Sequence, residues 1–358
     1  MLAWLMIAGG LIALTFGADL LVKGASTLAA RLGVPTIVIG LTVVAFGTSA
    51  PEMAVSVSGA WKGQAAIAVG NVLGSNLFNI LVILGLSALI LPLVVHQQVV
   101  RVEVPIMFSA AVLTYFFCQD GKLNFIEGLL TFGLLGVYIL YQIRNSLREG
   151  SAPGDGEVEI KPNGNSKPWR DFFYILAGLG LLVFGADRFV EGAVQIARSF
   201  GVSELVIGLT IVAVGTSLPE VATSVVAAFR KQADIAVGNV VGSNIFNSLG
   251  VLGLAGTVSP DPVEVSAKAV TFDFPLTIAV SLLCFPLFLR GLKIGRLEGI
   301  GFVLSYAAYV MFLILDQLGH PLVKGKQAFV VQWAFPAVAL LLIIYASREL
   351  FKNLREDS

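Results

Sequence analysis

The sequence is poor in charge, in cysteine and in histidine. Only 13% of its 358 residues are charged, and 23 basic side chains balance 23 acidic ones, whereas soluble domains carry about 25% charged residues. A balanced chain gives no indication of nucleic acid or of a strongly acidic partner. The cysteines, Cys118 and Cys284, both lie inside apolar runs, where neither a disulfide nor a metal site is expected.

Motifs of intramembrane and metal-dependent enzymes are also absent. His96 and His320 lie far apart, and the chain has no HExxH, CxxC, GxGD or GxSxG sequence. A hydrolytic enzyme needs a positioned nucleophile or a metal-activated water, and these motifs are common ways of supplying one. We therefore expect neither an enzyme nor a resident cofactor.

Apolar residues dominate instead. The chain is 56% hydrophobic with a mean hydropathy of +0.87, and a helix that spans a bilayer needs ~20 mainly apolar residues. The sequence therefore predicts an all-α polytopic membrane protein embedded in lipid. The first run has no basic segment before it and no cleavage signal, so we interpret it as a span. The expected spans are residues 2–30, 35–60, 67–95, 102–118, 124–143, 171–199, 203–229, 235–258, 267–289, 296–316 and 328–347.

The chain contains one long stretch twice. Residues 36–85 and 204–253 align without a gap and are identical at 32 of 50 positions, and GAD stretches near Gly17 and Gly185 match at the same offset. Many identical positions are polar, which lipid contact alone does not explain. The repeat divides the chain into residues 1–143 (first five-span repeat), 144–170 (polar linker), 171–316 (second five-span repeat) and 317–358 (an extra eleventh span and tail).

Because five spans separate equivalent points, each element is expected to cross the membrane in the opposite direction to its twin. The repeats are then inverted, an architecture common in secondary transporters with a site at the midplane. If the N-terminus is outside, 16 of the 23 Lys and Arg residues fall on the inner side. By the positive-inside rule, we expect a cell (inner) membrane protein with its linker and C-terminus in the cytoplasm.

Two glutamates lie in the middle of apolar runs. Glu52 and Glu220 have no Lys or Arg within nine residues on either side. A carboxylate at the bilayer centre costs at least ~2.5–3.5 kcal/mol and usually marks an ion pathway. A protonated glutamate bonded to a neighbouring helix is the structural alternative. The recurrence of the glutamate at twin positions favours a paired functional site over this alternative.

A proline precedes each glutamate and predicts a broken helix. Pro51 and Pro219 lack an N–H, and a proline ring clashes with the carbonyl four residues back. Backbone freed in this way inside a membrane must line a cavity or bind something. The hydroxyls next to the break, with two carboxylates, would form an all-oxygen site that suits Ca²⁺ or Na⁺. These hydroxyls belong to Thr48, Ser49, Thr216 and Ser217. A merely kinked helix would explain the prolines but not the acids.

The third span of each half carries GNxxGSNxFN. Asn71, Ser75 and Asn79 recur every four residues and so share a helix face. Small-residue helix packing and ion contact are both open for Asn71, Asn76 and their twins Asn239 and Asn244. For Asn79 and Asn247, the deepest of each set, we expect ligation or contact through water.

These motifs resemble the α-repeats of the calcium:cation antiporter superfamily. GTSxPE with GNxxGSNxFN, present twice in order, is similar to the pattern of bacterial and archaeal sodium/calcium exchangers. The resemblance implies that Glu52 and Glu220 bind both Ca²⁺ and Na⁺, exchanged one for three. It implies further ligands from Thr48, Ser49, Thr216, Ser217, Ser75, Ser243 and the carbonyls of Ala45 and Ala213. Potassium-dependent relatives have aspartate at the position of Asn247, so potassium co-transport is not expected.

Two other transport activities fit the same pattern. Calcium/proton exchange would protonate the glutamates in the return step, but relatives of that type usually have Asn-Ala where this chain has Thr48-Ser49. A passive cation channel is also compatible with the composition.

Of the remaining acids, Asp19 and Asp187 are expected to make structural or gating contacts. Glu103 and Asp273, near predicted span ends, are expected to be solvated or interfacial.

Overall fold

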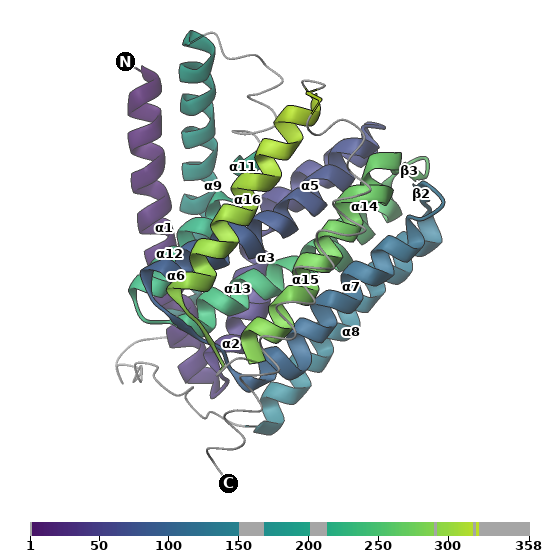
Figure 1. The fold of residues 1–358 in the computed structure, drawn as a ribbon. Helices are drawn as coiled ribbons and strands as arrows, with labels where there is room; N and C mark the ends of the chain where they lie inside the picture. The colour runs from purple at the N-terminus through teal and green to yellow at the C-terminus, as the bar shows by residue number, and fades with distance from the viewer. Residues whose placement is uncertain (1, 150–167, 201–212, 290–291, 318–319, 322–358) are drawn as a thin grey trace.

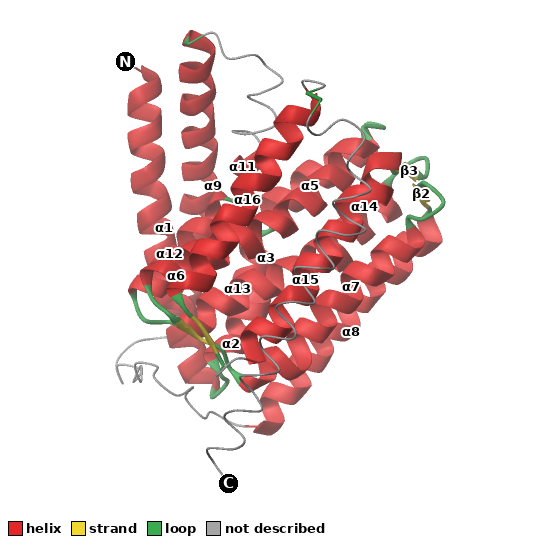
Figure 2. Cartoon of the chain, in the orientation of Figure 1, coloured by secondary structure: helices red, strands yellow, loops and turns green. Residues whose placement is uncertain are grey.

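The computed structural model describes residues 2–149, 168–200, 213–289, 292–317 and 320–321. The chain is helical almost throughout (Figure 2). Within the described residues, eight helices are long and apolar enough to cross a membrane, or nine if one bent pair is counted as a span. The chain is thus a multi-pass membrane protein. The predicted eleventh span and residues 203–212 of the seventh lie outside the described residues.

The first half consists of α1 (Leu2–Leu32), α2 (Thr36–Ile39), η1 (Gly40–Val44), α3 (Ala45–Thr48), α4 (Ala50–Trp61), α5 (Ala65–Phe78), η2 (Asn79–Leu84), α6 (Gly85–Ile90), η3 (Val99–Glu103), α7 (Val104–Phe117) and α8 (Phe125–Glu149). The η segments are π-helical. Helix α8 continues to Glu149, beyond the predicted end of the fifth span at residue 143, because its polar last turns, including Arg144 and Arg148, contain good helix formers.

The second half repeats this order with α9 (Pro168–Ser199), α11 (Ala213–Gly215), α12 (Leu218–Phe229), α13 (Ala233–Ile245), η5 (Phe246–Val251), α14 (Leu252–Val258), η6 (Ala269–Asp273), α15 (Phe274–Leu289) and α16 (Arg296–Gln317). Each π-helical segment described in this half has a counterpart in the first. The local structure therefore follows the sequence repeat.

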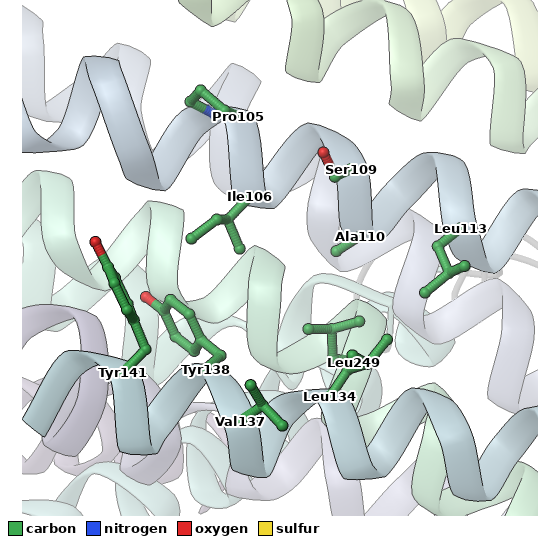
Figure 3. A pocket seen from close by; sticks show the side chains of 10 residues that line it. All are labelled: Pro105, Ile106, Ser109, Ala110, Leu113, Leu134, Val137, Tyr138, Tyr141 and Leu249. Atoms are coloured by element: carbon green, nitrogen blue, oxygen red, sulfur yellow. The ribbon is translucent and has the colours of Figure 1, made fainter. Parts of the chain in front are cut away.

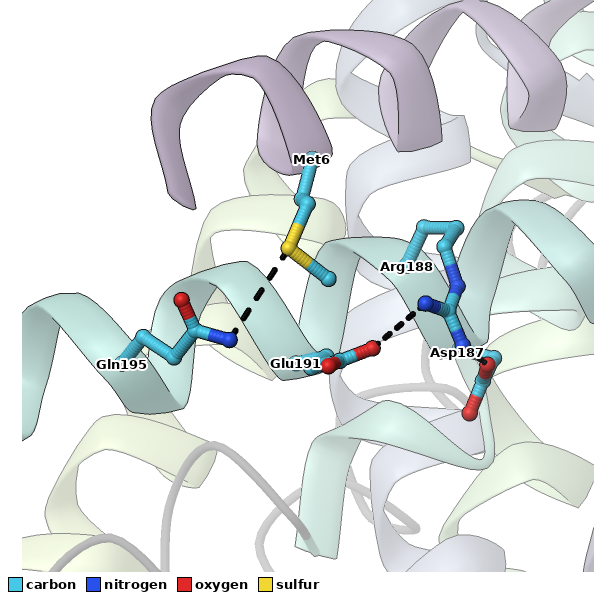
Figure 4. A network of polar contacts seen from close by, with 5 residues as sticks. All are labelled: Met6, Asp187, Arg188, Glu191 and Gln195. Atoms are coloured by element: carbon cyan, nitrogen blue, oxygen red, sulfur yellow. Dashed lines mark hydrogen bonds and ion pairs between the residues drawn. The ribbon is translucent and has the colours of Figure 1, made fainter. Parts of the chain in front are cut away.

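Helices α1 and α9 lie side by side along much of their length, at an angle to the bundle formed by α5, α7, α8, α14, α15 and α16 (Figure 1). Glycines spaced seven apart allow the close approach. A Cβ on Gly10 or Gly17 would lie 2.7–2.9 Å from main-chain atoms of α9. Polar contacts join the same helices, among them Gln195 Nε2 to Met6 Sδ at 3.9 Å (Figure 4).

Two short antiparallel strand pairs connect the halves. Strand β1 (Leu93–Val94) pairs with β4 (Lys293–Ile294), and β2 (Lys122–Leu123) pairs with β3 (Val263–Glu264). In each pair, a loop of the first half is bonded to a loop of the second. The halves are thus joined at their loops as well as through the apolar core, which both halves supply.

Candidate cation-binding site

Helix breaks place the two glutamates. The first half bends by 46° between residues 36–48 and α4. Pro51 lies in the first turn of α4, where an N–H would have no partner within the helix, so the missing N–H of proline costs no hydrogen bond. In the second half, α11 ends at Gly215 and α12 begins at Leu218. The predicted breaks are confirmed. Glu52 and Glu220, in the first turns of α4 and α12, are 1% and 0% exposed.

A serine from the opposite half contacts each carboxylate. Ser217 Oγ donates to Glu52 Oε1 at 2.8 Å, and Ser49 Oγ donates to Glu220 Oε1 at 3.2 Å. Both serines lie at the breaks just before the glutamate helices. The break in each half thus completes the surroundings of the glutamate in the other.

The third-span residues lie beside these glutamates. Ser75 Oγ is 3.5 Å from Glu52 Oε1 and 3.2 Å from Ser217 Oγ. Its twin Ser243 is fully buried in α13, and its Oγ has no hydrogen-bond partner among the described residues. Asn79 begins η2 and Asn247 lies in η5, and both are buried. Within the same described part of the chain, neither amide has a partner for its nitrogen or its oxygen.

The remaining predicted ligands lie at the helix breaks. Thr48 Oγ1 is buried and lies 3.0 Å from Asn239 Oδ1, 3.1 Å from Val44 O and 3.4 Å from Ala45 O, with the asparagine oxygen as the nearest acceptor for its single proton. Ala45 begins α3, and its oxygen also accepts the Ser49 N–H at 3.0 Å. Thr216 follows α11, which begins at Ala213.

Unpartnered oxygens make this region a candidate cation site. Buried polar atoms in proteins almost always have a partner, yet Glu52 Oε2 and Glu220 Oε2 have none in the part of the chain that the structure describes. Among the described residues, the ion pairs involve neither glutamate. Two uncompensated buried carboxylates are unfavourable. A hard cation bound by carboxylate, hydroxyl and amide oxygens would satisfy them.

Comparison with known proteins agrees with this geometry. The sequence profile of the sodium/calcium exchanger protein family matches residues 2–144 and 171–315. The chain belongs to this family. Members of the sodium/calcium exchanger family are transporters, so the chain is a cation/calcium antiporter of this kind and not an enzyme.

Relatives of the exchanger are similar over nearly their whole length. A putative antiporter, CaxA, of Alkalimonas amylolytica is 37% identical, with 87% of this chain and 99% of CaxA covered. Sodium/calcium exchanger MaX1 of Methanosarcina acetivorans is 34% identical over 87% of this chain and 98% of its own. The solved structure of the sodium-calcium exchanger NCX_Mj, soaked with Na⁺ and Ca²⁺, matches with a TM-score of 0.75 at 32% identity, covering 87% of this chain and 98% of that one.

The structure gives Asn71 and Asn239 specific contacts, whereas the sequence left open whether they serve helix packing or ion contact. Asn71 Nδ2 donates to Glu52 O at 3.1 Å and to Ser56 Oγ at 2.9 Å, and its Oδ1 accepts from Thr216 Oγ1 at 3.3 Å. Asn239 makes the matching contacts with Glu220 O, Ser224 and Thr48. Their recurrence in both halves was the available signal. The contacts themselves depend on helix packing, which the sequence does not specify.

Other acidic residues differ from one another in their surroundings. Asp19 forms an ion pair with Arg230, and Asp187 with Arg188 (Figure 4), as expected for structural contacts. The expectation that Glu103 is solvated or interfacial is wrong, because its side chain is 0% exposed. Side chains from two elements cover it, because Tyr138 Oη of α8 donates to its Oε2 at 3.0 Å and Gln98 Nε2 donates to its Oε1 at 3.2 Å.

Proposed function

We propose that this protein exchanges Na⁺ for Ca²⁺ at one site near the membrane midplane, built from Glu52, Glu220 and the hydroxyls and amides around them. The observation that carries this proposal is the pair of buried carboxylates, each bonded to a serine of the opposite half and each with one oxygen that has no partner among the described residues. The names of MaX1 and NCX_Mj give the same pair of ions.

Charge explains why the two ions would exclude each other. One Ca²⁺ neutralises both carboxylates, whereas Na⁺ must supply at least two ions to do so. Both kinds of ion would use the same oxygens, from Glu52, Glu220, Thr48, Ser49, Thr216, Ser217, Ser75, Ser243, Asn79, Asn247 and the carbonyls of Ala45 and Ala213. An empty pair of buried carboxylates is costly. The exchanger would therefore change its exposed face only when loaded, and this couples the two ion fluxes.

The proposed mechanism is alternating access by two inverted repeats. Strand pairing supports the inversion, since β1 and β4 follow the third and ninth spans, which would both end inside, and β2 and β3 would both lie outside. We propose that α1 and α9, closely packed on each other, slide together against the other helices. The N-terminus is proposed to be outside the cell (inner) membrane, with the linker and C-terminus inside.

Flux into proteoliposomes tests the proposal. Vesicles loaded with Na⁺ should take up ⁴⁵Ca²⁺ only while an outward Na⁺ gradient exists. Glu52→Gln and Glu220→Gln should each reduce this uptake by more than about tenfold, because a neutral amide cannot balance the ion's charge. Glu264→Gln, at an exposed glutamate, is the matched control and should retain full uptake.

Other outcomes identify the competing activities. Uptake driven by an outward proton gradient in the absence of Na⁺ would indicate calcium/proton exchange. Uptake that follows the Ca²⁺ gradient alone would indicate a passive channel. Full uptake by an inserted Glu52→Gln or Glu220→Gln protein would remove that glutamate from the site.

A further inference from the structure

A second buried acid lies outside the proposed transport site. Glu103 ends η3, at the start of the helix that continues as α7, and is 0% exposed. Gln98 Nε2 donates to its Oε1 at 3.2 Å, and Tyr138 Oη donates to its Oε2 at 3.0 Å. Arg101 lies in the same π-helical segment but is exposed. Among the described residues, no ion pair involves this carboxyl.

An unpartnered amide oxygen belongs to the same cluster. Gln142 Nε2 donates to Tyr138 Oη at 2.9 Å, while Gln142 Oε1 has no partner among the residues that the structure describes, and Gln142 is 0% exposed. The Tyr138 ring lines a largely apolar cavity of about 410 Å³ between α7 and α8, with Ser109 and Tyr141 as the other hydroxyl-bearing residues of its lining (Figure 3). A buried carboxyl without a cationic partner, joined through Tyr138 to an unpartnered amide oxygen, is an arrangement that a positively charged ligand would satisfy.

The second half shows which kind of ligand would fit. Asp273 ends η6 as Glu103 ends η3, and each acid is followed by an apolar residue and a proline. Tyr309 stands in the second half where the first half has Tyr138. Five residues before Asp273, however, stands Lys268.

The first half has neutral amides instead of this cation. Gln98 stands five residues before Glu103, where the second half has Lys268, and Gln142 stands where the second half has Leu313. An amide oxygen is a ligand for hard cations, whereas an ammonium is itself the cation. The second half therefore carries a positive charge in this segment, where the first half carries amides whose oxygens could bind a cation from solution.

We propose that Glu103, Gln98, Tyr138 and Gln142 bind a monovalent alkali cation, Na⁺ or K⁺, at a site separate from the one proposed for transport. One carboxylate balances one positive charge, so a divalent ion would leave an uncompensated buried charge. Gln98 is only partly buried and adjoins exposed Gln97, which gives the ion a route from the end of the bundle. The bound ion would connect η3 to α8 and stabilise their packing.

Thermal unfolding of the purified full-length protein tests this site. We would use the double variant Glu52→Gln/Glu220→Gln, which disables the proposed transport site, and add NaCl, KCl or choline chloride at equal ionic strength. Because a ligand bound only by the folded state stabilises it, NaCl or KCl should raise the melting temperature by about 2–4 °C at saturation. Choline chloride should not. If the double variant is not obtained, the wild-type response to Na⁺ should show two phases and that of Glu103→Gln one.

Two further changes identify the residues responsible. Glu103→Gln should abolish the alkali-ion response. Gln98→Lys introduces the lysine of the second half, so the protein should be as stable without alkali ions as the parent is with them, and should no longer respond. Lys268→Gln is the matched control and should leave the response intact.

The proposal is overturned if Glu103→Gln or Gln98→Lys still responds, if choline chloride acts as NaCl does, or if acidification alone produces the same stabilisation. The last result would show that Glu103 binds only a proton. Since the double variant lacks both transport-site carboxylates, these results are independent of whether the chain exchanges Na⁺ for Ca²⁺.

Discussion

Asn71 and Asn239 act on the proposed site through other residues. Each donates to the main-chain oxygen of the glutamate in its own half and accepts a threonine hydroxyl of the other half. A hydroxyl that donates its proton in this way keeps its lone pairs for a cation. These asparagines are therefore positioning residues, comparable to the second shell of a metal site.

Asn71→Ala should weaken the apparent Na⁺ affinity by about 10–100-fold, the usual effect of losing a second-shell contact. Thr216→Val should weaken the apparent Na⁺ affinity similarly. The Asn71→Ala/Thr216→Val double variant should bind Na⁺ little more weakly than either single variant, because each single change already removes the same interaction. Na⁺-dependent ⁴⁵Ca²⁺ uptake at varied Na⁺ concentration measures this.

Asn76→Ala is the control for the asparagine change. Asn76 donates to Ser248 at 3.0 Å and makes no recorded hydrogen bond to Glu52 or Thr216, so its loss should not show this coupling to Thr216→Val. Fully additive effects of Asn71→Ala and Thr216→Val would show that Asn71 acts elsewhere.

At the scale of elements, the packing of α1 on α9 depends on glycine. A Cβ at Gly17 would lie 2.9 Å from Gly178 O and Leu182 N, whereas one at Gly9 would meet nothing within 4 Å. Gly17→Ala should therefore destabilise the protein by about 1–3 kcal/mol through overpacking. Thermal unfolding in detergent measures it.

The paired control is Gly9→Ala, which should leave the melting temperature unchanged or raise it, because alanine is the better helix former. Equal melting temperatures for the Gly17→Ala and Gly9→Ala variants would contradict close α1–α9 packing in the membrane protein.

Some elements could be predicted from the sequence and others could not. The break before α4 follows from Pro51, whose effect is local, and the burial of Glu52 follows from its place in a long apolar run. The π-helical segments η2 and η5 have no comparable local signal. Burial of Glu103 was mispredicted for a similar reason, since it depends on α8, which lies more than twenty residues further along the chain.

At the scale of the whole molecule, the proposed orientation in the membrane can be tested by cysteine labelling. Cys118 and Cys284 are buried, so the native thiols should react slowly. A cysteine introduced by Ser151→Cys in the polar linker should react with a membrane-impermeant maleimide only after the membrane is permeabilised, which gives the reagent access to the cytoplasmic side. Labelling of this cysteine in intact cells would show that the linker lies outside, opposite to the proposed topology.

The sequence repeat predicted which residues form the candidate site, but not which of them contact one another. The repeat identified both glutamates and the residues around them, because equivalent residues recur at equal spacing. It could not show that Ser217 contacts Glu52 while Ser49 contacts Glu220. Such exchange between halves requires the halves to be packed together, and this depends on the whole bundle.

The central claim is that two carboxylates from two halves form one site for which Ca²⁺ and Na⁺ compete. Equilibrium binding of ⁴⁵Ca²⁺ to the purified protein, titrated with NaCl against choline chloride, tests it most directly. We predict saturable binding that Na⁺ displaces completely, that is lost in both Glu52→Gln and Glu220→Gln, and that persists in Glu264→Gln. Ca²⁺ that remains bound at saturating Na⁺, or that binds unchanged without either glutamate, would contradict the account.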